Sequence, residues 1–116
     1  MSNNFIQKGD TLTYEAGAAA KEGDVVILGE LAIVNAYDVS SGDSGEGHTT
    51  GVFELSKKAS DAPAQFTAAY WDESKKYVTT TGTGNKQIGI FAEAGVASAD
   101  TVLVKLYNPF VPYVAP

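Results

Sequence analysis

The sequence predicts an all-β fold, a compact small β-sandwich or barrel-like domain with short hairpins and at most one or two short helical turns. Alternating apolar and polar residues recur in short runs along the chain, which is typical of strands with one solvent-facing side. Gly, Asp and Ser separate these runs. Helical signals are scarce, because the Ala-rich segment 16–21 spans only about a turn and a half at helical pitch.

The first half of the chain contains the clearest hairpin. Residues 25–28 and 31–34 are apolar on both faces, and Gly29-Glu30 between them is typical of a tight turn. We therefore expect this hairpin at the centre of the core. A run at 11–14 precedes it.

The same turn chemistry introduces both of these early strands. Gly9-Asp10 precedes the first and Gly23-Asp24 the second. Glycine adopts a positive φ at little cost, and the Asp side chain can cap the turn.

The middle of the chain is expected to be less regular. Residues 40–48 combine small polar side chains with three glycines, which predicts a mobile, exposed loop. A strand is expected at 52–55. Segment 56–65, which contains Pro63, is expected to hold one short helical turn.

The second half begins with an aromatic segment. Residues 70–81 indicate an aromatic strand, a charged turn and a Thr-rich strand. Residues 82–85 then predict a hairpin turn into a strand at 88–92. The run 101–107 completes the set.

Composition limits the function. A chain of 116 residues fits one domain, and a net charge of -6 without any Arg argues against binding to DNA or RNA. With no Cys there is no disulfide or thiolate chemistry. The N-terminus lacks signal-peptide features and no apolar run is long enough to span a membrane. We expect a soluble protein that is not exported and is made in a reducing cytoplasm, without cofactor or metal.

No constellation of residues indicates catalysis. His48 is the single histidine and is expected to be a solvated loop residue. Asp38, Asp43 and Glu46 lack the spacing of a calcium loop. Neighbouring Asp72 and Glu73 would point to opposite faces of a strand or, in a turn, to water.

Two further segments contain residue types that are found in ligand-binding sites. The Gly-rich segment 82–89 contains Lys86 but leads into a strand, so it does not fit a phosphate-binding loop. Tyr70, Trp71 and Tyr77 could form a sugar-stacking platform, although core packing is the commoner role of such rings. The platform supports the alternative function, a carbohydrate- or cell-surface-binding β module.

Several segments together carry a family resemblance. They are 4–12, 21–26, 51–57, 70–89 and 102–106. In their order and spacing the chain resembles the small decoration, or cement, proteins of tailed-bacteriophage capsids, long catalogued as a domain of unknown function. The family pattern has a Gly-Asp before the aromatic strand, where this chain has 67–69, and it seldom has a tail like 109–116.

The resemblance implies a structural virion protein without catalytic activity. It implies an all-β subunit that self-associates, as a trimer in preference to a dimer, on the outside of a shell built from an HK97-type major capsid protein. Such a protein would stabilise the capsid by bridging neighbouring capsid subunits.

The chain is accordingly expected to comprise an N-terminal arm at 1–8, a single β domain at 9–108 and an apolar Pro-containing tail at 109–116. An arm can add a strand to another protein's sheet edge, and buried aromatic residues anchor interfaces. The candidate capsid or inter-subunit contacts are Asn3, Asn4, Phe5, Ile6, Phe110, Val111 and Tyr113.

Overall fold

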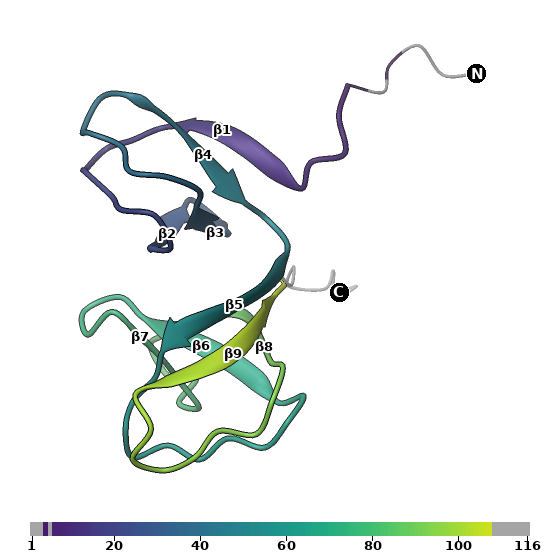
Figure 1. Ribbon diagram of the computed structural model, residues 1–116, viewed down its shortest axis with the longest axis vertical. Helices are drawn as coiled ribbons and strands as arrows, with labels where there is room; N and C mark the ends of the chain where they lie inside the picture. The colour runs from purple at the N-terminus through teal and green to yellow at the C-terminus, as the bar shows by residue number, and fades with distance from the viewer. Residues whose placement is uncertain (1–3, 5, 108–116) are drawn as a thin grey trace, which may run out of the picture.

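The computed structural model describes Asn4 and residues 6–107. Two antiparallel sheets, without any helix in these residues, form a compact globule, which confirms the all-β prediction. Figure 1 shows the sheets as two lobes joined by the β4–β5 connection. The strands are β1 (Thr11–Glu15), β2 (Val25–Leu28), β3 (Leu31–Asn35), β4 (Ser44–His48), β5 (Gly51–Ser56), β6 (Ala68–Asp72), β7 (Tyr77–Thr79), β8 (Lys86–Phe91) and β9 (Thr101–Leu106).

The first sheet has the order β1-β4-β3-β2. Its β2–β3 hairpin confirms the prediction from Gly29-Glu30, with Leu28 opposite Leu31 across the turn. Gly9 and Gly23 have φ values of 85° and 87°, so both predicted turns are confirmed. Below the second turn, the Asp24 carboxylate accepts a hydrogen bond from the Lys21 amide at 2.9 Å.

Strand β4 corrects the prediction of a mobile, exposed loop for residues 44–48, whereas residues 40–43 are exposed and lie outside any strand. The strand lies inside the first sheet, paired with both β1 and β3. Its glycines are buried because neighbouring side chains occupy the space above them. A Cβ on Gly47 would lie 2.6 Å from Ile33 Cδ1, and one on Gly45 would lie 2.8 Å from Tyr14 Cε1. These glycines therefore serve close packing between strands.

A buried asparagine fixes the first sheet further. The Tyr14 hydroxyl donates to Asn35 Oδ1 at 2.8 Å. Asn35 Nδ2 donates in turn to the carbonyl oxygens of Tyr37 and Lys21, at 2.8 and 3.1 Å. Asn35 is only 1% exposed, and buried polar groups are stable when they are bonded in this way.

The second sheet has the order β5-β9-β8-β6-β7 and curls into a half-barrel. The predicted hairpin turn at 82–85 is wrong, because β7 and β8 do not pair with each other: both pair with β6, which lies between them. The connection instead crosses the end of β6. The expected helical turn within 56–65 is also wrong, since these residues form turns and an isolated β-bridge.

The curl brings the edge strands β5 and β7 together at a seam. Lys57 forms a parallel bridge with Val78, and the Lys58 amide donates to the Val78 carbonyl at 2.9 Å. The Lys57 side chain is buried, and its ammonium donates to the carbonyls of Lys58, Ala59 and Asp61 at 2.9, 3.3 and 2.8 Å. All three donors of the ammonium are therefore used.

The Asp61 carboxylate ties the same turn to β7. It accepts the Thr79 hydroxyl at 2.6 Å and the Thr80 amide at 3.0 Å. Burial acts to raise the pKa of Asp61, but these hydrogen bonds and the charges of Lys58 and Lys57 outweigh it and hold the pKa below its ordinary value.

Acid should therefore weaken the seam. A depressed carboxyl pKa contributes stability above the unfolded pKa of about 3.9, and this contribution disappears as pH falls through the lower folded value. We expect Asp61→Asn to cost about 1–2 kcal/mol of unfolding free energy at pH 7 and to flatten the loss of stability below about pH 4. Urea unfolding at several pH values measures this, with exposed Asp10→Asn as control. Equal acid slopes in both variants would contradict it.

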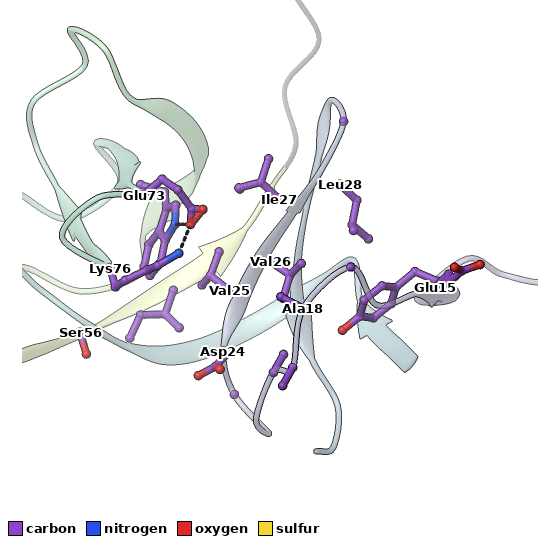
Figure 2. A pocket seen from close by; sticks show the side chains of 18 of the residues that line it. Glu15, Ala18, Asp24, Val25, Val26, Ile27, Leu28, Ser56, Glu73 and Lys76 are labelled. Atoms are coloured by element: carbon purple, nitrogen blue, oxygen red, sulfur yellow. Dashed lines mark hydrogen bonds and ion pairs between the residues drawn. The ribbon is translucent and has the colours of Figure 1, made fainter. Parts of the chain in front are cut away.

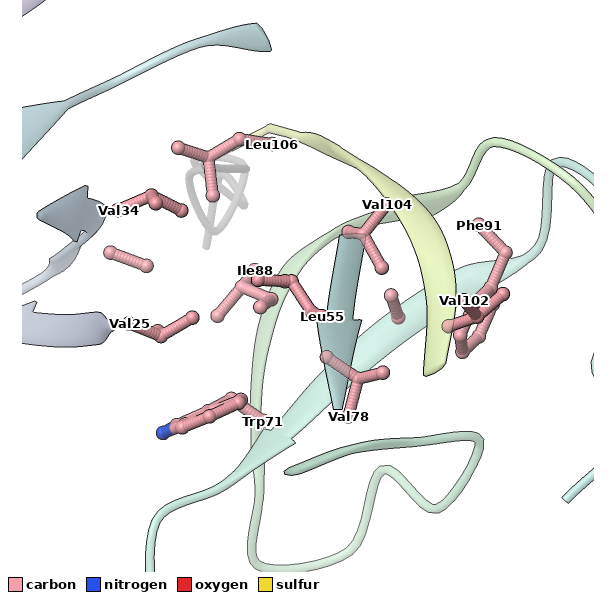
Figure 3. Packing of buried hydrophobic residues seen from close by; sticks show 12 residues of the cluster. Val25, Val34, Leu55, Trp71, Val78, Ile88, Phe91, Val102, Val104 and Leu106 are labelled. Atoms are coloured by element: carbon pink, nitrogen blue, oxygen red, sulfur yellow. The ribbon is translucent and has the colours of Figure 1, made fainter. Parts of the chain in front are cut away.

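The core lies between the lobes and inside the half-barrel. Figure 3 shows Val25 and Val34 of the first sheet pointing toward Leu106, Ile88 and Leu55 of the second. Most members of the cluster come from the second sheet. The expectation that residues 25–34 form the centre of the core is therefore only half right. Strand β3 is buried on both faces, whereas three of the four residues of β2 are half-exposed.

Candidate functional site

The residues that could carry chemistry have structural roles. His48 is half-buried at the end of β4, with its ring centroid 5.5 Å from that of Phe53, so the expectation of a solvated loop residue is corrected. Asp38 accepts the Glu22 amide at 2.9 Å and Glu46 accepts the Thr13 hydroxyl at 2.5 Å. Within the described part of the chain, no group of three or more acidic or histidine side chains could hold a metal ion.

Asp72 and Glu73 organise the turn between β6 and β7. The Ser74 hydroxyl and the amides of Lys75 and Ser74 donate to Asp72 Oδ1, and these bonds lower the pKa of Asp72. The Lys76 ammonium lies 2.5 Å from Glu73 Oε1 and lowers the pKa of Glu73. The prediction of a charged hairpin is confirmed, and both acids stay ionised at neutral pH.

The aromatic side chains do not form the platform that a sugar-binding module would need. Trp71 is 6% exposed and belongs to the core, with Nε1 donating to Glu73 at 3.2 Å. Tyr70 immediately precedes Trp71 in β6 and so lies on the opposite face, where its ring covers Gly82. Tyr77 pairs with Asp72 and shares the Tyr70 face. The three rings therefore cannot stack on one ligand.

The outer surface of the half-barrel carries exposed apolar side chains. Val52 on β5 is 55% exposed and Leu103 on β9 is 36% exposed, and Tyr107 just beyond β9 is 54% exposed. Val52 lies opposite Lys105 and Leu103 opposite Glu54 in the β5–β9 ladder. We call these five residues the outer β5–β9 face. Sequence reasoning missed it, although Leu103 stands at a solvent-facing position of an alternating strand.

A groove forms the second surface feature. It has a volume of about 860 Å³ and lies between β2, β5 and the β6–β7 turn. Figure 2 shows Val25 and Ile27 on the side of β2 that faces Glu73 and Lys76. Tyr14 lines another part of the groove, where burial and the charge of Asp24 raise its pKa.

The predicted arm contacts are only partly described. Asn4 is exposed and Ile6 is 85% exposed, ahead of the first strand. Asn3, Phe5, Phe110, Val111 and Tyr113 lie outside the described residues. No helix in the described residues is long and apolar enough to cross a membrane.

Residues 6–106 match the model of the phage cement protein family. The chain belongs to the phage cement protein family. No curated protein and no solved structure matches it. Family membership supports a structural, capsid-associated role, and it covers both sheets from the arm to the end of β9.

Proposed function

We propose that this protein binds the outside of a phage capsid and stabilises it by bridging subunits of an HK97-type major capsid protein. The family match carries the proposal, since cement proteins are structural partners of capsids. The surface supports it, because exposed apolar side chains gather on the outer β5–β9 face. The role requires adhesion and no catalytic step. Assembly takes place in the host cytoplasm.

The outer β5–β9 face is proposed as the contact between copies in a homotrimer. Its apolar side chains lie between Glu54 and Lys105, so a second copy can meet it with both apolar and ionic contacts. An oligomer multiplies individually weak contacts with the shell, because the first contact raises the effective concentration of the others. This explains why a small acidic domain could hold several capsid subunits together.

The double variant Val52→Glu and Leu103→Lys tests this contact. Each new charge lies opposite an existing one of opposite sign, Lys105 or Glu54, and the net charge stays at -6. We expect unfolding free energy to change by no more than about 1 kcal/mol, whereas sedimentation velocity should shift from trimer to monomer. Val96→Glu, at a loop residue 67% exposed, is the matched control. A double variant that remains trimeric would remove this face from the interface.

The arm is proposed to contact the shell. Asn3, Asn4, Phe5 and Ile6 precede β1, and an extended segment there can add a strand to an exposed edge of a capsid protein. Phe110 is a further proposed contact with the shell, whereas for Val111 and Tyr113 we propose a different partner, the groove of their own chain.

Co-sedimentation of purified protein with undecorated capsid shells tests the function. We expect the full chain to pellet with shells and to raise their resistance to heat. Removing residues 1–6 should abolish pelleting and leave the oligomer intact. A full chain that stays in the supernatant at micromolar concentration would contradict the proposed function.

A further inference from the structure

The groove has an unused strand edge along one wall. Strand β2 is the last strand of its sheet and pairs only with β3 among the described residues. The Asn35 amide donates to the Asp24 carbonyl at 2.8 Å. Because bonding alternates along an antiparallel strand, the even-numbered residues face β3 and the main-chain groups of Val25 and Ile27 face away from it, toward the groove. Such an edge is a template for another strand.

The tail has a donor pattern that fits one edge only. Residues 108–116 read Asn-Pro-Phe-Val-Pro-Tyr-Val-Ala-Pro. Main-chain groups of alternate residues point to the same edge of a strand. From residue 110 onward, Val111, Tyr113 and Ala115 on one edge have an N–H, whereas Pro112 and Pro116 on the other edge have none; Pro109, which precedes this stretch, also lacks an N–H. As a strand, residues 110–116 can therefore pair along their odd-numbered edge, and Pro112 and Pro116 block further addition along the other.

The tail also starts at the right place and is long enough. Strand β9 ends at Leu106, which belongs to the same buried cluster as Val25 and lies beside Val34 (Figure 3). Nine extended residues span about 30 Å, whereas the five-residue edge 24–28 spans about 17 Å. A covalently attached segment has an effective concentration on the order of millimolar, which lowers the affinity that docking requires.

The side chains complement the groove as well. The tail carries no charged side chain at neutral pH, while the groove is lined by four acidic residues and one lysine: Glu15, Asp24, Glu54, Glu73 and Lys76. An apolar strand avoids the repulsion that an acidic one would meet there. Paired antiparallel on β2, the tail would place Val111 and Tyr113 on the same face as Val25 and Ile27, in the groove that Trp71 also lines. Phe110 would lie on the opposite face.

We propose that residues 108–116 dock in the groove of their own chain as a strand added to β2. The family match ends at residue 106, so this added strand is a feature of the chain beyond the family pattern. It completes the first sheet as a five-stranded one, covers the groove-lining edge of Trp71 and leaves Phe110 available to the capsid. The inference rests on the groove and the tail and does not require the capsid role.

Two Val→Pro variants of the full chain form a matched test. Val111→Pro removes a donor from the pairing edge, whereas Val114→Pro places a proline on the edge that already carries two. We expect Val111→Pro to raise hydrogen exchange at the Val25 and Ile27 amides about tenfold, equivalent to about 1.4 kcal/mol. Acrylamide quenching of Trp71, the single tryptophan, should rise as well. Val114→Pro should match the wild type in both measurements.

Two other results of the Val→Pro experiment would overturn the proposal. If neither variant changes amide exchange, the tail does not occupy the groove and the proposal is wrong. If both variants change it equally, the tail packs without strand pairing, which also overturns the proposal.

An engineered disulfide between Ile27→Cys and Tyr113→Cys identifies whose tail is bound, because the chain has no native Cys. We expect an oxidised monomer on a denaturing gel. Disulfide-linked oligomers would assign the groove to a neighbour's tail and contradict docking within one chain.

Discussion

Replacing Gly89 with alanine should lower the free energy of unfolding by more than about 3 kcal/mol. Gly89 lies on β8, opposite Leu106 of β9. A Cβ there would overlap the Lys105 carbonyl oxygen and lie 3.0 Å from its carbon and 3.2 Å from the Tyr107 nitrogen. These are backbone atoms, so they cannot move without separating β8 from β9. The substitution should therefore open the middle of the half-barrel.

Urea unfolding followed by Trp71 fluorescence measures this effect. Gly17→Ala is the matched control, because a Cβ at Gly17 would meet nothing within 4 Å. It should be neutral or stabilise by up to about 1 kcal/mol through the unfolded chain. If Gly89→Ala unfolded at the same urea concentration as Gly17→Ala, the close approach of β8 and β9 would be wrong.

Replacing Lys57 with methionine should cost about 3 kcal/mol. Methionine can occupy the space of the aliphatic stem, but it cannot donate to the three carbonyls that the ammonium binds. Those acceptors lie in the turn that follows β5, and this turn is hydrogen-bonded to β7. Their loss should weaken contact between β5 and β7, while the β5–β9 ladder persists.

Amide exchange distinguishes this local effect from general destabilisation. In Lys57→Met, exchange should increase first at Lys58, whose amide donates across the seam to Val78. Lys75→Met makes the same substitution at an exposed lysine and should change stability by no more than about 0.5 kcal/mol. Equal stability of the two variants would show that the buried ammonium does not hold the seam.

The local sequence predicted the positions of most strands well, but it predicted poorly which strands pair with each other in the sheets. The β2–β3 hairpin was predictable because its turn and both strands are contiguous in sequence. Strand β4 was not, because Gly45 and Gly47 indicate a loop unless one knows that Tyr14 and Ile33 lie above them. The same limit explains the wrong hairpin between β7 and β8. Nothing local at 82–85 reveals that β6 occupies the space between those strands.

The same distinction applies to the candidate surfaces: a contact segment that is continuous in sequence was predictable, whereas surfaces formed by distant segments were not. The arm could be predicted as a contact segment from its place before the first strand. The outer β5–β9 face depends on the register that sets Val52 opposite Lys105, and the groove depends on how the two sheets pack. The burial of Lys57 could not be predicted either, because nothing in the sequence distinguishes this lysine from the exposed lysines. Its role depends on the three carbonyl oxygens that the folded chain places around its ammonium.

The position of β9 has a consequence for how a subunit matures. Among the strands of the described residues it is the last in sequence, but it sits between β5 and β8. While the ribosome is still extending the chain, β5 therefore lacks its main partner, and the larger sheet closes only when synthesis has passed Leu106. A prematurely terminated chain would lack the assembled half-barrel. Only nearly full-length translation products could therefore fold and bind to a phage capsid.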